Sequence, residues 1–252
     1  MLVHGGLNDG EKTLNDTIFL DFNTLKWNKL DIRGTRSPYL SSHSSEFVLE
    51  NEKLYNPTYH VYKGSNLIEN TNIIKKIEFE GIYVFGGIDE DKNYKNEVFV
   101  LRVGRKPCEW THLKINGNPP LPRANASMNF FQNLNILVIA GGKNDTIKRC
   151  IFNDVFVLDL ENLYWIKAAT YPVQPKERTG HRAAVYNSQL FILGGNNIKK
   201  FLSMDFFVID LDLFSNKYRE RDRDRFKEID MKGKLIDRGK KVDTGFEGNN
   251  QM

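Results

Sequence analysis

Residues 136–142 read Ile-Leu-Val-Ile-Ala-Gly141-Gly142, and variants of this stretch occur four times along the chain. The other copies end in Gly5-Gly6, Gly86-Gly87 and Gly194-Gly195. An apolar run closed by two glycines is typical of a buried strand that ends in a tight turn. Chance would give only about one or two such pairs at this glycine content, so the recurrence indicates an internal repeat.

The residues after each glycine pair also recur. A dipeptide suited to starting a strand follows at Asn15-Asp16, Asn96-Glu97, Asn153-Asp154 and Met204-Asp205, and a second apolar run comes next. The chain's three tryptophans lie 21, 23 and 23 residues after their glycine pairs, at Trp27, Trp110 and Trp165. One repeat position therefore carries the indole, and we expect this large ring to wedge between adjacent repeat units.

A loop containing proline or arginine and one more strand complete the unit. The loops are residues 36–38, 119–123 and 175–181, and the strands after them are expected near 44–49, 127–131 and 182–186. Successive units are 55 and 53 residues long, measured between Gly87, Gly142 and Gly195. One unit thus comprises four short strands, whose near-continuous apolar runs predict sheets covered on both faces.

Residues in this order resemble the kelch repeat, the blade of one β-propeller family, from about Leu2 to Leu211. The resemblance implies an all-β, kelch-type β-propeller of about three to four four-stranded blades. The paired glycines and the three tryptophans are then structural residues of the blades. They are not expected to bind a ligand.

Three features depart from the family pattern. The chain opens inside a blade, residues 50–77 form an insertion, and the fourth unit lacks a tryptophan. We therefore expect an incomplete propeller. A fragment of a longer protein is the favoured interpretation, and self-association or completion by a partner is the alternative.

Two regions are expected: a propeller segment over residues 1–215 and a charged tail over 216–252. The chain has 36 Lys+Arg against 32 Asp+Glu, a net charge of +4, and residues 216–241 alone carry +5. The tail alternates Arg219, Arg221, Arg223 and Arg225 with acidic residues. This pattern predicts a solvated helix or a disordered segment, and the nearly neutral remainder does not indicate nucleic-acid binding.

Antiparallel connectivity places the loops between second and third strands on one rim, together with the loops that link blades. Kelch proteins commonly bind partner peptides on this rim, so the resemblance implies another protein, acidic or phosphorylated, as partner. The candidate contacts are Arg36, Arg123, Arg178, Asp89, Asn144 and Asn196. The alternative is that each arginine only bonds backbone carbonyls of a neighbouring blade.

The 50–77 insertion is expected on the opposite rim. Its Tyr55, Tyr59 and Tyr62 form either a docking surface or a packing contact between the loop and the propeller.

No catalytic or metal-ligating pattern is visible in the sequence, and no cofactor motif is present. His43 and His181 occupy corresponding repeat positions and are expected to be structural, while Cys108 and Cys150 lack CxxC spacing. Without a secretory leader or an apolar run of about 18 residues, we expect a reduced, cytoplasmic protein that does not enter a membrane.

The predicted function is a non-enzymatic protein-interaction module or scaffold. The alternative is a regulatory kelch domain of a larger enzyme, such as a kelch-bearing phosphatase. A carbohydrate-acting propeller enzyme is the least favoured, because its copper centre has no counterpart here.

Overall fold

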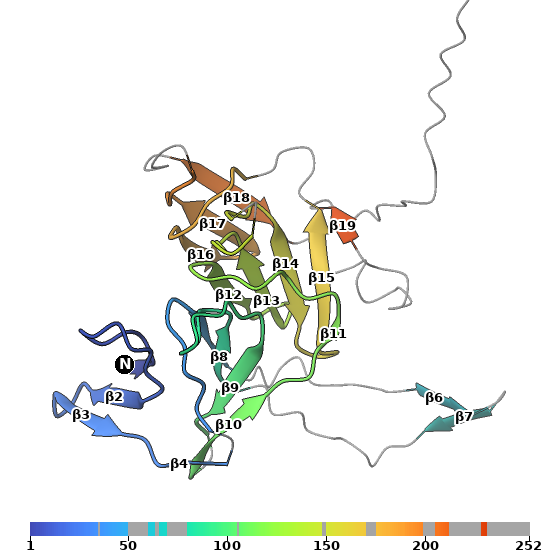
Figure 1. Ribbon diagram of the computed structural model, residues 1–252. Coiled ribbons are helices and arrows are strands. Elements are labelled where there is room, and N and C mark those ends of the chain that lie inside the picture. Colours follow the sequence, from blue (N-terminus) through green and yellow to red (C-terminus); the bar gives the residue numbers. More distant parts are fainter. Residues whose placement is uncertain are drawn as a thin grey trace, which may run out of the picture.

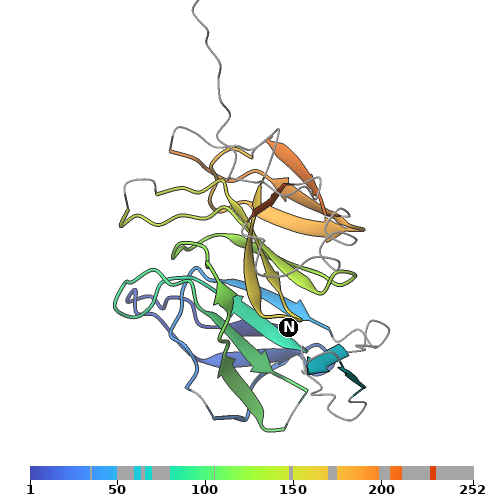
Figure 2. The ribbon, with the colours of Figure 1, turned by 90° about the vertical axis from the view of Figure 1, so that its right-hand side faces the viewer.

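The computed structural model describes residues 1–34, 36–49, 60–63, 66–69, 80–104, 106–147, 150–169, 175–198, 205–211 and 228–230. Every regular element in these ranges is a β-strand. Four of the five sheets, here called blades 1 to 4, follow one another in chain order through the molecule, and the fifth is a two-stranded hairpin described below (Figures 1 and 2). The predicted all-β, propeller-type architecture is confirmed.

Each blade is an antiparallel meander of strands in chain order, which the 50–77 insertion interrupts in blade 2. Blade 1 contains β1 (Leu2–His4), β2 (Thr17–Asp21) and β3 (Lys26–Lys29). Blade 2 contains β5 (Ser44–Val48), β8 (Gly81–Phe85), β9 (Val98–Arg102) and β10 (Cys108–His112). Blade 3 contains β12 (Ser127–Phe131), β13 (Ile136–Ala140), β14 (Val155–Asp159) and β15 (Tyr164–Ala169). Blade 4 contains β16 (Arg182–Tyr186), β17 (Gln189–Leu193) and β18 (Phe206–Asp210).

Short parallel strands, which the repeat pattern did not predict, border blades 2 and 3. The chain leaving blade 1 forms β4 (Ile32–Gly34) along the outer strand β10. The chain leaving blade 2 likewise forms β11 (Asn116–Gly117) along β15. Each of these segments therefore ties one blade to the next by backbone hydrogen bonds.

The tail and the insertion are described only in part. In the tail, β19 (Glu228–Asp230) pairs in parallel with β15, so these three residues form a strand, neither helix nor disordered chain. In the insertion, β6 (His60–Lys63) and β7 (Asn66–Glu69) form a hairpin. Tyr55 and Tyr59 lie outside the described residues, and the docking surface proposed for this loop stays a prediction.

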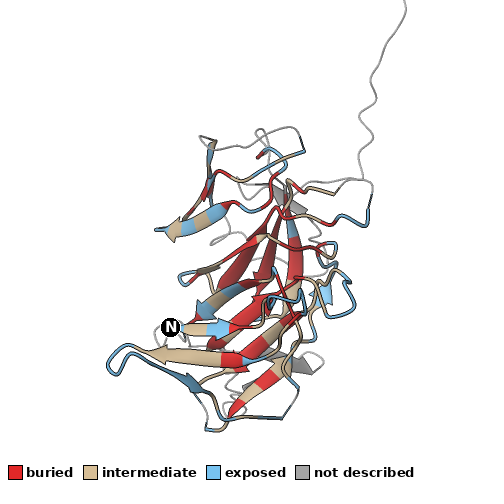
Figure 3. Cartoon of the chain, turned by 60° about the vertical axis from the view of Figure 1, so that its left-hand side comes forward, coloured by how far each residue is buried: buried red, intermediate tan, exposed pale blue. Residues whose placement is uncertain are grey.

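The apolar core lies between the blades. Strands β13 and β14 are buried at every residue, because β13 and β14 have a neighbouring blade on each face. Three buried clusters fill the interfaces between blades 1 and 2, 2 and 3, and 3 and 4. Burial is accordingly deepest in the middle of the stack and shallowest in blades 1 and 4 (Figure 3).

The three tryptophans do not share one environment. Trp110 is 0% exposed and Trp165 is 4% exposed, each wedged against the preceding blade as its repeat position predicts. Trp27 is 51% exposed, in contrast to the expectation. Trp27 holds the repeat position of Trp110, whose face meets the preceding blade, and blade 1 is the first blade among the described residues.

The first three glycine pairs mark the points where a blade meets the linker of the next one. Gly141 has φ +60°, and a Cβ there would lie 2.7 Å from the Arg178 carbonyl oxygen. The amide of Gly142 donates to the same oxygen at 2.9 Å. Any larger residue would push the linker away, which explains why this position carries glycine.

Candidate functional site

In blades 1 to 3, the rim loops owe their shape to one polar residue that follows the glycine pair by two positions. The Asn8 side-chain oxygen accepts the amides of the residues two and four further on, at 3.0 and 2.9 Å. Asp89 does the same at 3.0 and 2.8 Å, and Asn144 accepts the amide two residues on at 3.0 Å. These side chains hold turns in place. Asp89 and Asn144, both predicted as partner contacts, thus have a demonstrable role within their own loops.

Contacts between loops make the rim of blades 1 to 3 a continuous surface. The Thr13 hydroxyl donates to the Asp89 carbonyl oxygen at 3.3 Å, from blade 1 to blade 2. The Tyr94 hydroxyl donates to the Asp145 carboxylate at 2.9 Å, from blade 2 to blade 3. The Lys143 ammonium also bonds Asp145, at 2.6 Å, and this hydrogen bond lowers the pKa of the carboxyl.

Arg123 is buried beneath the rim, with 1% of its surface exposed. Its guanidinium binds both carboxylate oxygens of Asp154, at 2.5 and 3.0 Å. It also donates to the carbonyl oxygens of Leu121 and Gly141, each at 2.9 Å, and stacks over the Phe152 ring at 4.1 Å. All of these groups belong to the linker or to blade 3. The side chain therefore joins the linker to the blade that the linker enters.

Arg178 repeats this arrangement one blade later. It is also 1% exposed, bonds the Asp205 carboxylate at 2.8 Å, and donates to the carbonyl oxygens of Lys176 and Gly194 at 3.1 and 3.2 Å. Arg123 and Arg178 thus bond backbone carbonyl oxygens and a carboxylate at the boundary between linker and blade. A structural role of this kind is the alternative that the sequence allowed for these arginines. The predicted partner contact at these two arginines is contradicted by their burial, because no free donor of theirs reaches the surface.

Arg36 differs from the other two arginines in its surroundings. Leu40 occupies the repeat position: its carbonyl oxygen accepts the Gly6 amide at 2.8 Å, as the Arg178 carbonyl accepts that of Gly142. Arg36 is exposed instead, and its guanidinium donates to the Tyr39 hydroxyl at 2.6 Å and lies 4.8 Å from that ring's centre. Tyr39 thereby holds an accessible cation in position.

A groove of about 320 Å³ runs beside Arg36, between blade 1 and β4. Its cationic lining residues are Lys29, Arg33 and Arg36, and its one acidic lining residue is Asp16. All four side chains are exposed. The groove is thus chemically suited to an anionic group such as a carboxylate or a phosphate.

Asn196, the remaining predicted contact, lies at the edge of blade 4. Its backbone exchanges two hydrogen bonds of 2.9 Å with Thr179, while the residue itself is exposed. The structure therefore brings Arg36, Asp89 and Asn196 to one rim but leaves Arg123, Arg178 and Asn144 buried.

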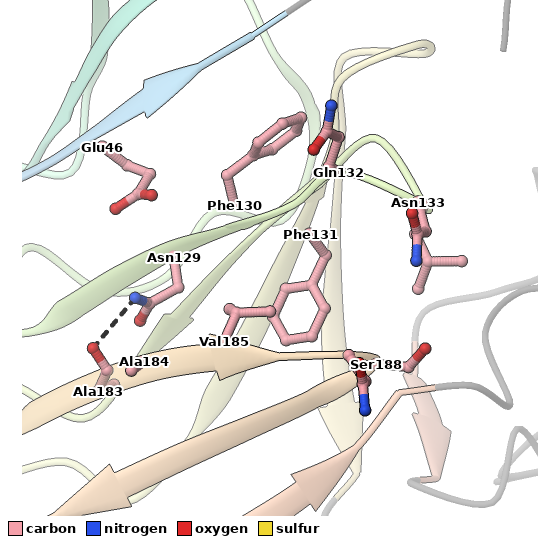
Figure 4. A pocket seen from close by; sticks show the side chains of 12 residues that line it. Glu46, Asn129, Phe130, Phe131, Gln132, Asn133, Ala183, Ala184, Val185 and Ser188 are labelled. Atoms are coloured by element: carbon pink, nitrogen blue, oxygen red, sulfur yellow. Dashed lines mark hydrogen bonds between the residues drawn. The ribbon is translucent and has the colours of Figure 1, made fainter. Parts of the chain in front are cut away.

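A second hollow, of about 540 Å³, lies along the inner strands β5, β12 and β16 and their turns (Figure 4). Asn129 donates to the Ala183 carbonyl oxygen at 3.2 Å, while its own amide oxygen is buried without a partner among the described residues. Burial raises the pKa of Glu46, which lines the same hollow. Sequence reasoning missed this hollow, although Glu46 and Asn129 hold the same repeat position.

The buried histidines lie at blade boundaries. His181 shares a 3.0 Å hydrogen bond with the Ser127 hydroxyl, and burial lowers its pKa to about 4. His4 lies 4.7 Å from the Trp110 ring, and burial likewise lowers its pKa to about 4. His43 packs its Cβ against Gly87. Over the described ranges, no cluster of three or more His, Cys, Asp or Glu side chains could hold a metal ion.

Stacked meanders joined at glycine pairs define a β-propeller built from sequence repeats. The sequence model of the KLHDC2/KLHL20/DRC7 Kelch-repeats domain matches residues 73–228, more than half of the chain. The chain therefore belongs to the kelch-repeat family. Kelch-repeat domains generally mediate protein–protein interactions.

Several curated proteins are similar to this chain. Acyl-CoA-binding domain-containing protein 4 of Arabidopsis thaliana is 26% identical over 212 residues, which are 84% of this chain and 28% of the relative. Dynein regulatory complex subunit 7 of Chlamydomonas reinhardtii is 30% identical over 118 residues, 46% of this chain and 10% of the relative. Host cell factor 1 of Homo sapiens is 34% identical over 134 residues, which are 45% of this chain and 6% of the relative. The chain thus spans about a quarter or less of these relatives.

In the described part of the chain, no helix has the length and apolar character needed to cross a bilayer.

Proposed function

We propose that this chain is a non-enzymatic protein-interaction module that binds an acidic or phosphorylated segment of a partner protein in the groove at Arg36. The observation that carries the proposal is the exposure of Arg36 beside Lys29 and Arg33, whereas Arg123 and Arg178 are buried. Asp16 in the lining and Asp31, which pairs with Arg33 at 3.8 Å, offset part of the charge of the three cations, and a surplus positive charge remains. An anionic group entering it gains charge-assisted hydrogen bonds.

Arg36 is the central contact of this proposal because its position is fixed before binding. The 2.6 Å hydrogen bond to Tyr39 limits the rotamers of the guanidinium, which reduces the entropy lost when a partner binds. Exposed ion pairs contribute at most about 1 kcal/mol each, so binding requires several contacts along the rim. The accessible residues next to Asp89 and Asn196 supply a surface for the rest of the partner.

The test is the affinity of the full chain for an array of acidic, phosphorylated and neutral peptides, measured by fluorescence anisotropy. We expect acidic or phosphorylated peptides to bind and Arg36→Ala to weaken their binding about fivefold, in line with about 1 kcal/mol for one exposed ion pair. Lys26→Ala removes an exposed cation at the other end of β3 and serves as the control. Unchanged binding by a variant lacking Lys29, Arg33 and Arg36 would exclude the groove.

A peptide affinity that falls with rising salt would also support binding in the Arg36 groove, because salt screens interactions between exposed charges. A partner that binds equally in high salt and to the Arg36→Ala variant would place recognition elsewhere on the rim. A regulatory role within a larger enzyme stays an alternative proposal, implied by the family resemblance, and cytoplasmic location likewise stays a prediction.

A further inference from the structure

The interface between blades 2 and 3 shows how two blades of this chain fit together. Blade 2 contributes one face, whose buried residues include Tyr83, Phe85, Val98 and Val100. Blade 3 contributes the opposite kind of face, with Ile139, Phe156, Leu158 and Trp165. The Phe85 and Trp165 rings meet edge to face, 5.7 Å apart. At the interfaces between blades 1 and 2 and between blades 2 and 3, a face that carries the indole therefore joins a face that lacks it.

Blade 4 presents the face without the indole to solvent. Its residues at the repeat positions of Tyr83, Phe85, Val98 and Val100 are Phe191, Leu193, Phe206 and Val208, here called the tail face. Cross-strand pairing places Phe191 opposite Val208 and Leu193 opposite Phe206, so all four lie on one side of the sheet. Phe206 is 56% exposed and its ring lies 5.8 Å from that of Phe191.

Blade 1 presents the face that carries the indole. Its residues at the repeat positions of Ile139, Phe156, Leu158 and Trp165 are Val3, Ile18, Leu20 and Trp27, here called the head face. Val3 pairs with Ile18 and Leu20 pairs with Trp27, so these four also share one side of their sheet. Their equivalents in blade 3 are almost completely buried, whereas Val3 and Trp27 are exposed.

The head face and the tail face are thus the two halves of one type of interface, present on the same molecule. We propose that two copies of this chain associate head to tail, with the head face of each copy packed on the tail face of the other. Trp27 of one copy would then meet Leu193 of the other as Trp165 meets Phe85 within the chain. The inference extends the proposed interaction role to a second copy as partner.

Physical arguments favour a second copy of the chain as the molecule that covers each exposed face. Contiguous exposed apolar patches usually mark interaction surfaces, and the repeat supplies a matching surface on an identical molecule. Head-to-tail contacts form a closed ring when the rotation between copies closes. Head-to-head association would set Trp27 against Trp27, an arrangement that the blade contacts inside the chain do not use.

The experiment is sedimentation equilibrium of the full chain with Trp27→Asp on the head face and Phe206→Asp on the tail face. We expect the wild type to dimerise and each variant alone to raise the dissociation constant at least about 30-fold, as for a buried aromatic anchor. An equimolar mixture of the two variants should recover a dimer, because one of its two contacts is intact. Phe22→Asp changes an exposed aromatic in the turn after β2, on neither face, and should leave the dimer unchanged.

Circular dichroism of each variant checks folding, and Val3→Asp with Val208→Asp provides a second pair on the same two faces. A monomeric wild type at the highest soluble concentration overturns the inference. A dimer lost in Trp27→Asp but kept in Phe206→Asp also overturns it, in favour of head-to-head contact. A monomer that still binds anionic peptides through Arg36 would leave the proposed function intact, which separates the two failures.

Discussion

Replacing the buried Arg123 with methionine tests whether the linker arginines hold the propeller together. Methionine keeps an unbranched apolar stem in the same space but donates no hydrogen bonds. Asp154 loses both of its contacts to the guanidinium, and the carbonyl oxygens of Leu121 and Gly141 each lose a donor.

The expected loss in the free energy of unfolding follows from these contacts. Removing one partner of a buried ion pair costs about 3–5 kcal/mol. The Asp154 side chain is 19% exposed, so water replaces part of what is lost and the low end, about 3 kcal/mol, applies. At a urea m-value of about 3 kcal/mol per M, the unfolding midpoint falls by about 1 M.

The assay is equilibrium urea unfolding followed by tryptophan fluorescence. Arg36→Met is the matched control: it makes the same chemical change at an exposed side chain and should cost less than about 0.5 kcal/mol. A loss below about 1 kcal/mol for Arg123→Met, or equal losses for both variants, would refute the bracing role. Asp154→Asn combined with Arg123→Met should cost less than the sum of the two single changes, because both remove one interaction.

Five further variants test three features of the fold. Gly141→Ala should cost more than about 2 kcal/mol because it adds a clash with the next linker, whereas Gly180→Ala, also at positive φ but with open space around it, should cost about 1 kcal/mol in the same unfolding assay. The pKa of His181 is about 4 when folded, below its unfolded 6.5, so stability should fall as the pH drops through that range. His181→Gln should remove about 3 kcal/mol of this fall, measured as urea midpoints between pH 7 and pH 4. In dilute solution Trp110→Ala should cost about 3–5 kcal/mol and Trp27→Ala about 1 kcal/mol or less, read by thermal melting.

The blade pattern was predictable because its physical causes repeat. A strand buried on both faces has to be apolar along its whole length, as in β13, and this leaves a visible run in the sequence. A backbone that approaches a neighbouring carbonyl has to be glycine, as at Gly141. Each requirement restricts which residue types can stand at a position, so the fold and the repeat unit could be predicted from the sequence.

The rim contacts were less predictable, because their roles depend on neighbours far along the chain. Arg36 and Arg123 both follow Trp-bearing strands and both lie near proline, yet only Arg123 reaches a carboxylate below the rim. The exposure of Trp27 also could not be read from its repeat position, since it depends on what covers blade 1. The two-residue strand β11 is too short to carry any periodic signal.

The parallel strands β4 and β11 bear on how the propeller is made. Each precedes, in the chain, the outer strand that it covers: β4 comes before β10, and β11 before β15. During synthesis the covering segment has therefore already left the ribosome when the outer strand emerges. Unpaired strand edges are templates for aggregation, and here the edge of each middle blade can close at once on a segment left by its predecessor. The order of elements along the chain thus shortens the time for which a nascent sheet is vulnerable.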